Sequence, residues 1–153
     1  METPIDFNGF IQVAIIVKNI DDAAKAWCEL FGVPIPAIEI QEPGKKEGVT
    51  YRGKDACYGL KLCCIEARDR GFVVELHEAT GGSSTFQEYV DKHGYGVHHL
   101  GFEVGDKRNA IINELQDRGI RVRQAGYHDD NSWTIVDSED LLGVNLNIKP
   151  RGK

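Results

Sequence analysis

Hydrophobic and polar residues alternate along several short stretches of the chain, most regularly over residues 96–104. In that stretch the apolar Leu100 and Phe102 alternate with His99 and Gly101. Alternation predicts a β-strand, because a strand points successive side chains to opposite faces. One face would be apolar and packed, while the other would carry an imidazole beside a residue without a side chain. The second face is suited to line a ligand-binding cleft.

The same reasoning along the whole chain predicts a mixture of strands and helices. Asn19 or Asp21 can cap the first helix and Gly32 can end it. Strands are expected over 10–17, 37–41, 60–65, 72–77, 96–104, 121–125, 132–136 and 143–148, and helices over 20–31, 85–93 and 106–118. Lys45–Glu47 and Gly81–Ser84 are expected to lie in loops.

The order of these elements repeats within the chain at an offset of 87 residues. Gln12 lands on His99 and Gly32 lands on Gly119, so that strand, helix and helix end all coincide. The offset is too long for a solenoid repeat, which spans roughly 20–50 residues. We therefore expect one domain over residues 1–153, built as two tandem βαβββ modules. The expected parts are module one at about 8–78, a connector at about 79–95 and module two at about 96–149.

Four of the expected strands carry a polar group on one face and apolar residues on the other. We expect the apolar faces to pack under the helices and the polar faces to line one curved cleft. The polar groups expected to converge in that cleft are Gln12, Glu75, His99 and Asn147. His77 shares the face of Glu75, while His98 falls on the opposite, packed face. Lys149 is expected to be a solvated chain end.

Composition and charge narrow the class of protein. The chain has 153 residues, of which 41% are hydrophobic and 27% are charged, as in an ordinary soluble domain. A net charge of −6 argues against nucleic acid or an anionic membrane as the main partner. No apolar run approaches the roughly 18 residues of a spanning helix. The first residues lack the features of a signal peptide, so we expect a cytoplasmic location.

Several segments together resemble the vicinal oxygen chelate superfamily. This superfamily includes glyoxalase I, methylmalonyl-CoA epimerase, extradiol dioxygenases and bleomycin- or fosfomycin-resistance proteins. The segments that carry the resemblance are Gln12–Ile20, Val74–Leu76, Lys92–Gly94, Gly96–Phe102 and Leu142–Ile148. The resemblance covers about residues 8–149 and is strongest to the epimerase and glyoxalase branch. It implies an α+β fold in which the two modules form a U-shaped partial barrel around one cleft, and it implies a homodimer.

The resemblance also implies a divalent metal ion in the cleft. The ligand positions of the branch fall on Gln12, Glu75, His99 and Asn147. Asn147 departs from the branch, which usually has glutamate there, and a neutral amide is a poorer ligand that cannot take a proton. Oxygen and nitrogen ligands do not distinguish zinc, nickel, cobalt, manganese and magnesium, and iron fits this set less well.

The implied chemistry is abstraction of a proton next to a carbonyl, with the metal stabilising the enolate. Glu75 is the carboxylate of the ligand set and so a candidate base, and Glu47 in the charged loop is a second. The prediction is a metal-dependent isomerase, epimerase or lyase acting on a small carbonyl compound or thioester. Arg52, Lys54 and Lys61 could meet an anionic group of that substrate.

Two alternatives stay open. The first is a metal-free protein of the same fold that binds a small molecule such as an antibiotic. Asn147 favours this reading, whereas an inward-facing Glu75 and His99 disfavour it. The second is an iron dioxygenase, which needs two histidines and a carboxylate. The sequence also leaves open whether the cleft lies within one chain or between two, and whether the loop His128–Asn131 borders its mouth.

Overall fold

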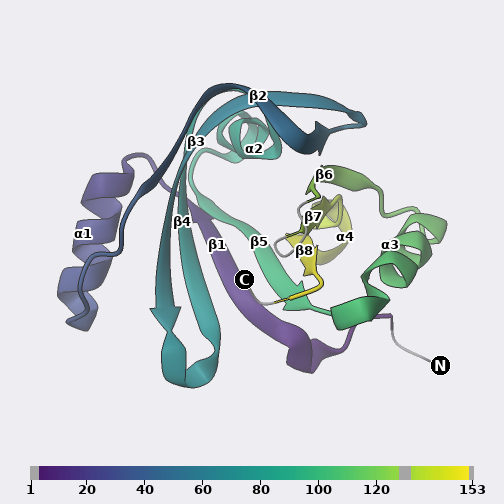
Figure 1. Ribbon diagram of the computed structural model, residues 1–153, viewed down its shortest axis with the longest axis horizontal. Coiled ribbons are helices and arrows are strands. Elements are labelled where there is room, and N and C mark those ends of the chain that lie inside the picture. Colours follow the sequence, from purple (N-terminus) through teal and green to yellow (C-terminus); the bar gives the residue numbers. More distant parts are fainter. Residues whose placement is uncertain (1–3, 128–131, 152–153) are drawn as a thin grey trace.

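A closed ring of hydrogen-bonded strands organises the protein (Figure 1). The computed structural model describes residues 4–127 and 132–151, and in that part of the chain the ring has eight strands. The strands are β1 (Phe10–Ile16), β2 (Glu39–Tyr51), β3 (Lys54–Ala67), β4 (Phe72–Ser83), β5 (Gly96–Glu103), β6 (Val122–Gly126), β7 (Trp133–Val136) and β8 (Asn145–Lys149). Around the ring their order is β1-β4-β3-β2-β6-β7-β8-β5. Sheet and helices together make the mixed α+β fold that the sequence predicts.

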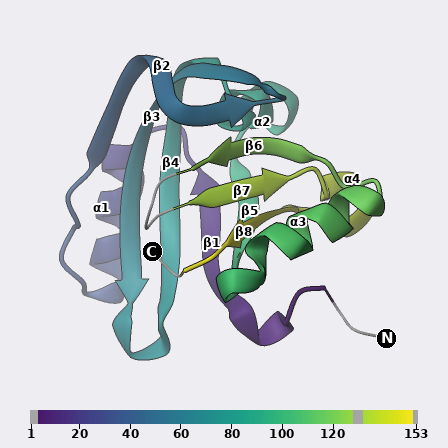
Figure 2. The same cartoon turned by 45° about the vertical axis from the view of Figure 1, so that its right-hand side comes forward.

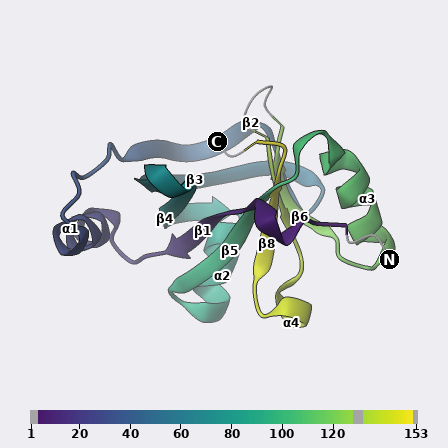
Figure 3. The same cartoon turned by 90° about the horizontal axis from the view of Figure 1, so that it is seen from below.

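The α-helices cover the ring from outside and at one end. They are α1 (Ile20–Phe31), α2 (Thr85–His93), α3 (Arg108–Asp117) and the short α4 (Glu139–Leu142), and single 3₁₀ turns span Phe7–Gly9, Arg68–Arg70 and Gly105–Lys107. Helices α1 and α3 lie on opposite sides of the molecule in all three views (Figures 1, 2 and 3). No helix in the described part of the chain is long and apolar enough to cross a membrane.

Helix α1 forms where the sequence predicts it. The Asn19 side chain accepts a hydrogen bond from the Asp22 N–H at 3.0 Å, which caps the start of the helix. Gly32 ends the helix in the left-handed region, at φ 64°, which glycine adopts without strain. The buried residues Ile20 and Ala24 recur at helical spacing and pack on the outer face of β3 and β4.

Helix α2 fills one end of the ring. Its Phe86 is buried with Ile16, Tyr58 and Leu60, and Tyr89 packs against the same cluster. Ser84 caps this helix by accepting from the Gln87 N–H at 3.1 Å. The apolar residues inside this end of the ring therefore belong to a separate core from those under α1 and α3.

The loop prediction for Lys45–Glu47 is wrong, because these residues lie within β2. The register of β2 against β3 shifts twice, and Gly44 (φ 154°) and Gly48 (φ 68°) absorb the irregular backbone. Bulges break the simple alternation by which a strand is recognised. Gly81–Ser84 was also expected in a loop, but β4 runs on to Ser83.

The strands form a closed ring, whereas the sequence predicted a U-shaped partial barrel. Closure comes from the last residues of β2, because Val49 pairs with Gly126 and Tyr51 pairs with Gln124 of β6. On the opposite side β1 and β5 are antiparallel neighbours. All eight strands belong to one chain, so the interior is enclosed without a second subunit.

Candidate functional site

An irregularity in β5 brings two adjacent histidines together. In the register with β1, Ala14 lies opposite His99 and Ile15 lies opposite Val97, so that His98 is an extra residue. The Nδ1 atoms of His98 and His99 are 2.8 Å apart and both rings are buried. His98 is thus packed and hydrogen-bonded as predicted, but beside His99 rather than on the opposite face.

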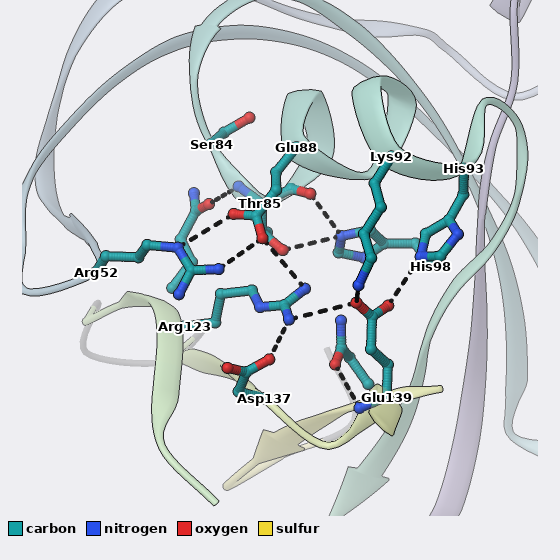
Figure 4. Close-up of polar contacts among 12 residues, drawn as sticks. Arg52, Ser84, Thr85, Glu88, Lys92, His93, His98, Arg123, Asp137 and Glu139 are labelled. Carbon is teal, nitrogen blue, oxygen red and sulfur yellow. Dashed lines mark hydrogen bonds and ion pairs between the residues drawn. The ribbon is translucent and has the colours of Figure 1, made fainter. Parts of the chain in front are cut away.

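The protonation of this pair follows from its partners. His98 Nε2 lies 3.1 Å from Thr85 Oγ1 and 3.2 Å from the Thr85 carbonyl oxygen (Figure 4). A carbonyl only accepts, so His98 Nε2 carries a proton and donates it. His98 Nδ1 must then accept from His99 Nδ1–H, which leaves the lone pair of His99 on Nε2.

Burial keeps both rings neutral. It lowers the pKa of His98 to about 3, and the charge of the nearby His77 acts in the same direction. Burial also lowers the pKa of His99 well below its usual value. Because a protonated His99 would have no lone pair on Nε2, the neutral form is the one that the hydrogen-bond chain requires.

Asn147 joins His99 to Gln12 across the interior. The backbone N–H of Thr134 donates to Asn147 Oδ1 at 3.0 Å and fixes the orientation of the amide. The Nδ2 end is therefore directed at two acceptors, Gln12 Oε1 at 3.3 Å and His99 Nε2 at 3.4 Å. A Cβ atom on Gly101 would lie 2.4 Å from Gln12 Oε1, so the space beside this glycine is filled by Gln12.

Glu75 is hydrogen-bonded to His77, with His77 Nε2 at 2.9 Å from Glu75 Oε2. Burial, the largest single influence, raises the pKa of Glu75. The hydrogen bond and charge of His77, the charge of Lys149 and a hydrogen bond from Gln12 outweigh it and hold this pKa below its ordinary value. Lys149 was expected to be solvated, but it is 5% exposed, because β8 directs it into the interior with Asn147.

Glu75, His77, His99, Asn147 and Lys149 line a cavity of about 370 Å³ inside the ring, whereas Gln12 and His98 do not. It is lined by Glu39, Gln41, Tyr58, Leu60, Leu62, Cys64, Glu75, His77, Phe86, His99, Trp133, Ile135, Asn147 and Lys149. A second pocket of about 630 Å³ adjoins it, and Cys64, Glu75 and Lys149 line both. A ligand that enters from the outer pocket therefore meets a carboxylate and an ammonium group at the boundary.

Cys64 is the third group at this boundary, and its Sγ lies 3.9 Å from Glu75 Oε1. Burial, followed by the charge of Glu75, raises the pKa of the Cys64 thiol to about 12. The thiol is therefore protonated near neutral pH and is a poor nucleophile.

Other predicted site residues do not line this cavity. Glu47 is exposed and lines a pocket of about 270 Å³ that shares Gln41, Tyr58 and Trp133 with the cavity. Arg52 forms an ion pair with Glu88 at 2.6 Å, and Lys61 forms one with Glu78 at 3.6 Å. Lys54 is exposed, and the loop His128–Asn131 lies outside the described residues.

The alternation of polar residues identifies the predicted ligand set of Gln12, Glu75, His99 and Asn147 as interior groups, but it misses Lys149. A strand end close to the C-terminus normally faces solvent. The signal that could have identified Lys149 is its place two residues after Asn147, on the same face of the strand.

The donor atoms as they lie do not fit a divalent metal ion. Within residues 4–127 and 132–151, no group of three or more His, Cys, Asp and Glu side chains could hold one. The lone pairs of Gln12 Oε1 and His99 Nε2 face the Asn147 amide nitrogen, which is a donor. His77 adds the second histidine that an iron dioxygenase needs, with Nε2 bound to Glu75 and a buried Nδ1 that has no hydrogen-bond partner within the described residues.

A family model described as the Glyoxalase/Bleomycin resistance protein/Dioxygenase superfamily matches residues 11–136 of the chain. The match spans strands from both halves of the ring, including β1, β5 and β7. No curated protein matches the chain.

Several solved structures have the same fold. The methylmalonyl-CoA epimerase of Mycobacterium tuberculosis is 19% identical, with a TM-score of 0.69 over 99% of this chain and 93% of that one. A variant of the Streptomyces coelicolor methylmalonyl-CoA epimerase, in complex with 2-nitronate-propionyl-CoA, is 20% identical, with a TM-score of 0.58 over 91% of each chain. A hypothetical protein of Bacillus halodurans is 16% identical, with a TM-score of 0.57 over 91% of each chain.

Proposed function

The chain belongs to the glyoxalase/bleomycin resistance protein/dioxygenase superfamily, and we propose that it is an isomerase or epimerase. It would move a proton next to the carbonyl of a small carbonyl compound or thioester. The observation that carries this proposal is the buried Glu75–His77 pair, with Lys149 beside it, at the boundary of two adjoining cavities. Structural neighbours of the fold are methylmalonyl-CoA epimerases, which supports the same class of reaction.

Glu75 is the proton acceptor in this proposal. Its carboxylate is ionised, lines both cavities and is held in place by the hydrogen bond from His77. Removal of a proton next to a carbonyl leaves negative charge on the carbonyl oxygen. The Lys149 ammonium group, buried on the same boundary, is placed to stabilise that charge where water is largely excluded. Return of a proton from Glu75 to the carbon completes the exchange.

The proposal is tested by hydrogen exchange of candidate substrates in D₂O, followed by ¹H NMR. The probes are methylmalonyl-CoA, which a structural neighbour binds, propionyl-CoA as a simpler thioester and acetoacetate as a small ketone. We expect the signal of the hydrogen next to the carbonyl to disappear faster with protein than without it. No exchange above background with any of these probes would contradict the proposal.

Three variants assign the roles. Glu75→Gln removes the proton acceptor and should lower the exchange rate by roughly 10²–10³-fold. Lys149→Met keeps an unbranched side chain one atom shorter and removes its charge, and it should lower kcat by about 10²-fold or more. Lys61→Met is the matched control, because Lys61 pairs with Glu78 and does not line either cavity. Wild-type rates in both site variants would overturn the assignment.

A metal-free binding protein of the same fold is the second candidate function. It is favoured by the hydrogen bonds among Gln12, His99 and Asn147, which link these polar side chains to one another. A binding protein would take up one of the probes without hydrogen exchange. If the protein only binds the probe, Glu75→Ala and His99→Ala should leave the affinity for the probe unchanged. If it is an isomerase or epimerase, both substitutions should weaken the complex with the probe.

We also propose that the two halves of the ring are copies of one βαβββ module. Support comes from their strand orders, because β1-β4-β3-β2 in the first half corresponds to β5-β8-β7-β6 in the second. The pairs β1–β4 and β5–β8 are both parallel. A lyase activity, the homodimer, the cytoplasmic location and a catalytic role for Glu47 stay predictions of the sequence.

A further inference from the structure

We infer that Asn147 keeps the cavity free of divalent metal ions, because its amide gives hydrogen bonds to two atoms that would otherwise be metal ligands. Those atoms are Gln12 Oε1 and His99 Nε2, at 3.3 and 3.4 Å from Asn147 Nδ2. The inference concerns the same cavity as the proposed function. It rests on the proposed function only in taking this cavity as the one that binds the substrate.

The amide cannot turn over to offer its oxygen instead. Asn147 Oδ1 accepts from the Thr134 N–H at 3.0 Å, and Thr134 is fully buried in β7. Turning the amide would place its N–H₂ group against this N–H and leave a buried donor without an acceptor. The orientation that disfavours a metal is therefore fixed by the backbone of a neighbouring strand.

His99 is fixed from its other side. Its Nδ1–H donates to His98 Nδ1, and His98 in turn donates to the Thr85 carbonyl. This chain of bonds directs the lone pair of His99 Nε2 at Asn147. Such an arrangement holds the imidazole ready as a ligand in metalloproteins. Here the amide of Asn147 occupies the position opposite that lone pair.

The charges around the cluster agree with this inference. Glu75 is the carboxylate among the predicted ligands, and it is hydrogen-bonded to His77 and lies close to the charge of Lys149. A divalent cation would add two positive charges where this carboxylate already has positive or hydrogen-bonding partners. Lys149 therefore supplies the positive charge that a metal would otherwise bring to the cavity.

The test is an isosteric exchange of one atom. Asn147→Asp keeps the acceptor for the Thr134 N–H and replaces the donor Nδ2 with an oxygen ligand. Asn147→Glu restores the residue type usual in the metal-binding branch that the sequence resembles. Asn113→Asp on the exposed face of α3 adds the same charge at a residue that does not line either cavity, and it is the matched control.

Each protein is stripped with EDTA, and its affinity for Zn²⁺, Mn²⁺ and Ni²⁺ alone is measured by equilibrium dialysis. We expect wild type and Asn113→Asp to bind these ions equally weakly. Asn147→Asp or Asn147→Glu should bind at least one of them on the order of tenfold more tightly. Stoichiometric binding by wild type, or no gain in either Asn147 variant, would overturn the inference.

A second measurement uses wild type and does not depend on a variant that folds. The ¹⁵N resonances of His99 should report a proton on Nδ1, and they should not move when Zn²⁺ is added. A zinc-dependent shift of Nε2 would overturn the inference. Neither measurement uses catalytic activity. Failure of the proposed function would appear as a lack of hydrogen exchange, whereas failure of this inference would appear as metal binding by the wild type.

Discussion

The neutral, buried His98 makes the stability of the protein depend on pH. Its pKa is lowered to about 3 by burial, whereas in the unfolded chain it returns to about 6.5. At pH values between these two pKa values, His98 is protonated in the unfolded chain and neutral in the folded protein. The free energy of unfolding therefore falls as the pH falls. Between pH 7 and pH 5 we expect a loss of roughly 2 kcal/mol from this residue. Urea unfolding of the wild type at the two pH values measures the total loss, to which the neutral, buried His99 contributes in the same direction.

The matched variant is His98→Gln, which removes the titrating group and retains hydrogen-bonding atoms. Its stability at pH 7 should be lower, but the difference between pH 7 and pH 5 should shrink by about the same 2 kcal/mol. The carboxylates with lowered pKa values titrate below this window and contribute little to it. An unchanged pH dependence in His98→Gln would show that His98 is not the group responsible.

Single residues show which positions in the site can be predicted from alternation along the sequence. Gln12, His99 and Asn147 lie together as predicted, although the pairing of β1 with β5 is irregular next to Gln12 and His99. His98 was assigned to the wrong face because no sequence signal marks the extra residue in β5. Lys149 was missed because its burial depends on the closure of the whole ring.

Helix α2 is held over the end of the ring by a buried arginine (Figure 4). Arg123 of β6 lies 3.7 Å from Glu88 of α2 and 3.5 Å from Glu139 of α4, and it also pairs with Asp137. We expect Arg123→Met to lower the free energy of unfolding by roughly 3 kcal/mol, because three carboxylates lose their common cation. Thermal and urea denaturation measure the change.

Arg52 provides the control within the same network. It pairs with Glu88 at 2.6 Å, but its side chain is half exposed to solvent. Arg52→Met should therefore cost about 1 kcal/mol or less. Equal losses in Arg52→Met and Arg123→Met would contradict the view that burial of Arg123 makes the difference.

Elements with regular periodicity were predictable, while those shaped by pairing were not. Helix α1 matches its predicted range, because its caps and apolar stripe are local in sequence. Strand β2 was shortened to 37–41 in the prediction, since the charged residues Lys45–Glu47 were assigned to a loop. Its continuation to Tyr51 is stabilised by pairing with β6, which lies more than 70 residues further along the chain.

At the scale of the whole molecule, closure of the ring within one chain decides how the cavity is completed. Glu75 comes from β4 and Lys149 from β8, and both strands belong to the same ring. We therefore expect the exchange activity per chain, or the affinity for a bound probe, to be independent of protein concentration. Measurements from about 10 nM to 10 µM, with the mass followed by light scattering, cover the range in which many dimers dissociate.

A homodimer predicted from the sequence is compatible with this expectation, provided that the second subunit binds outside the ring. The two arrangements differ in one observable. If strands were exchanged between subunits, Glu75 and Lys149 of one cavity would come from different chains, and activity would fall as the dimer dissociates. A mixture of the inactive Glu75→Gln and Lys149→Met variants would then recover activity, because one of its two cavities would contain both native residues. For the ring closed within one chain, we expect no recovery on mixing.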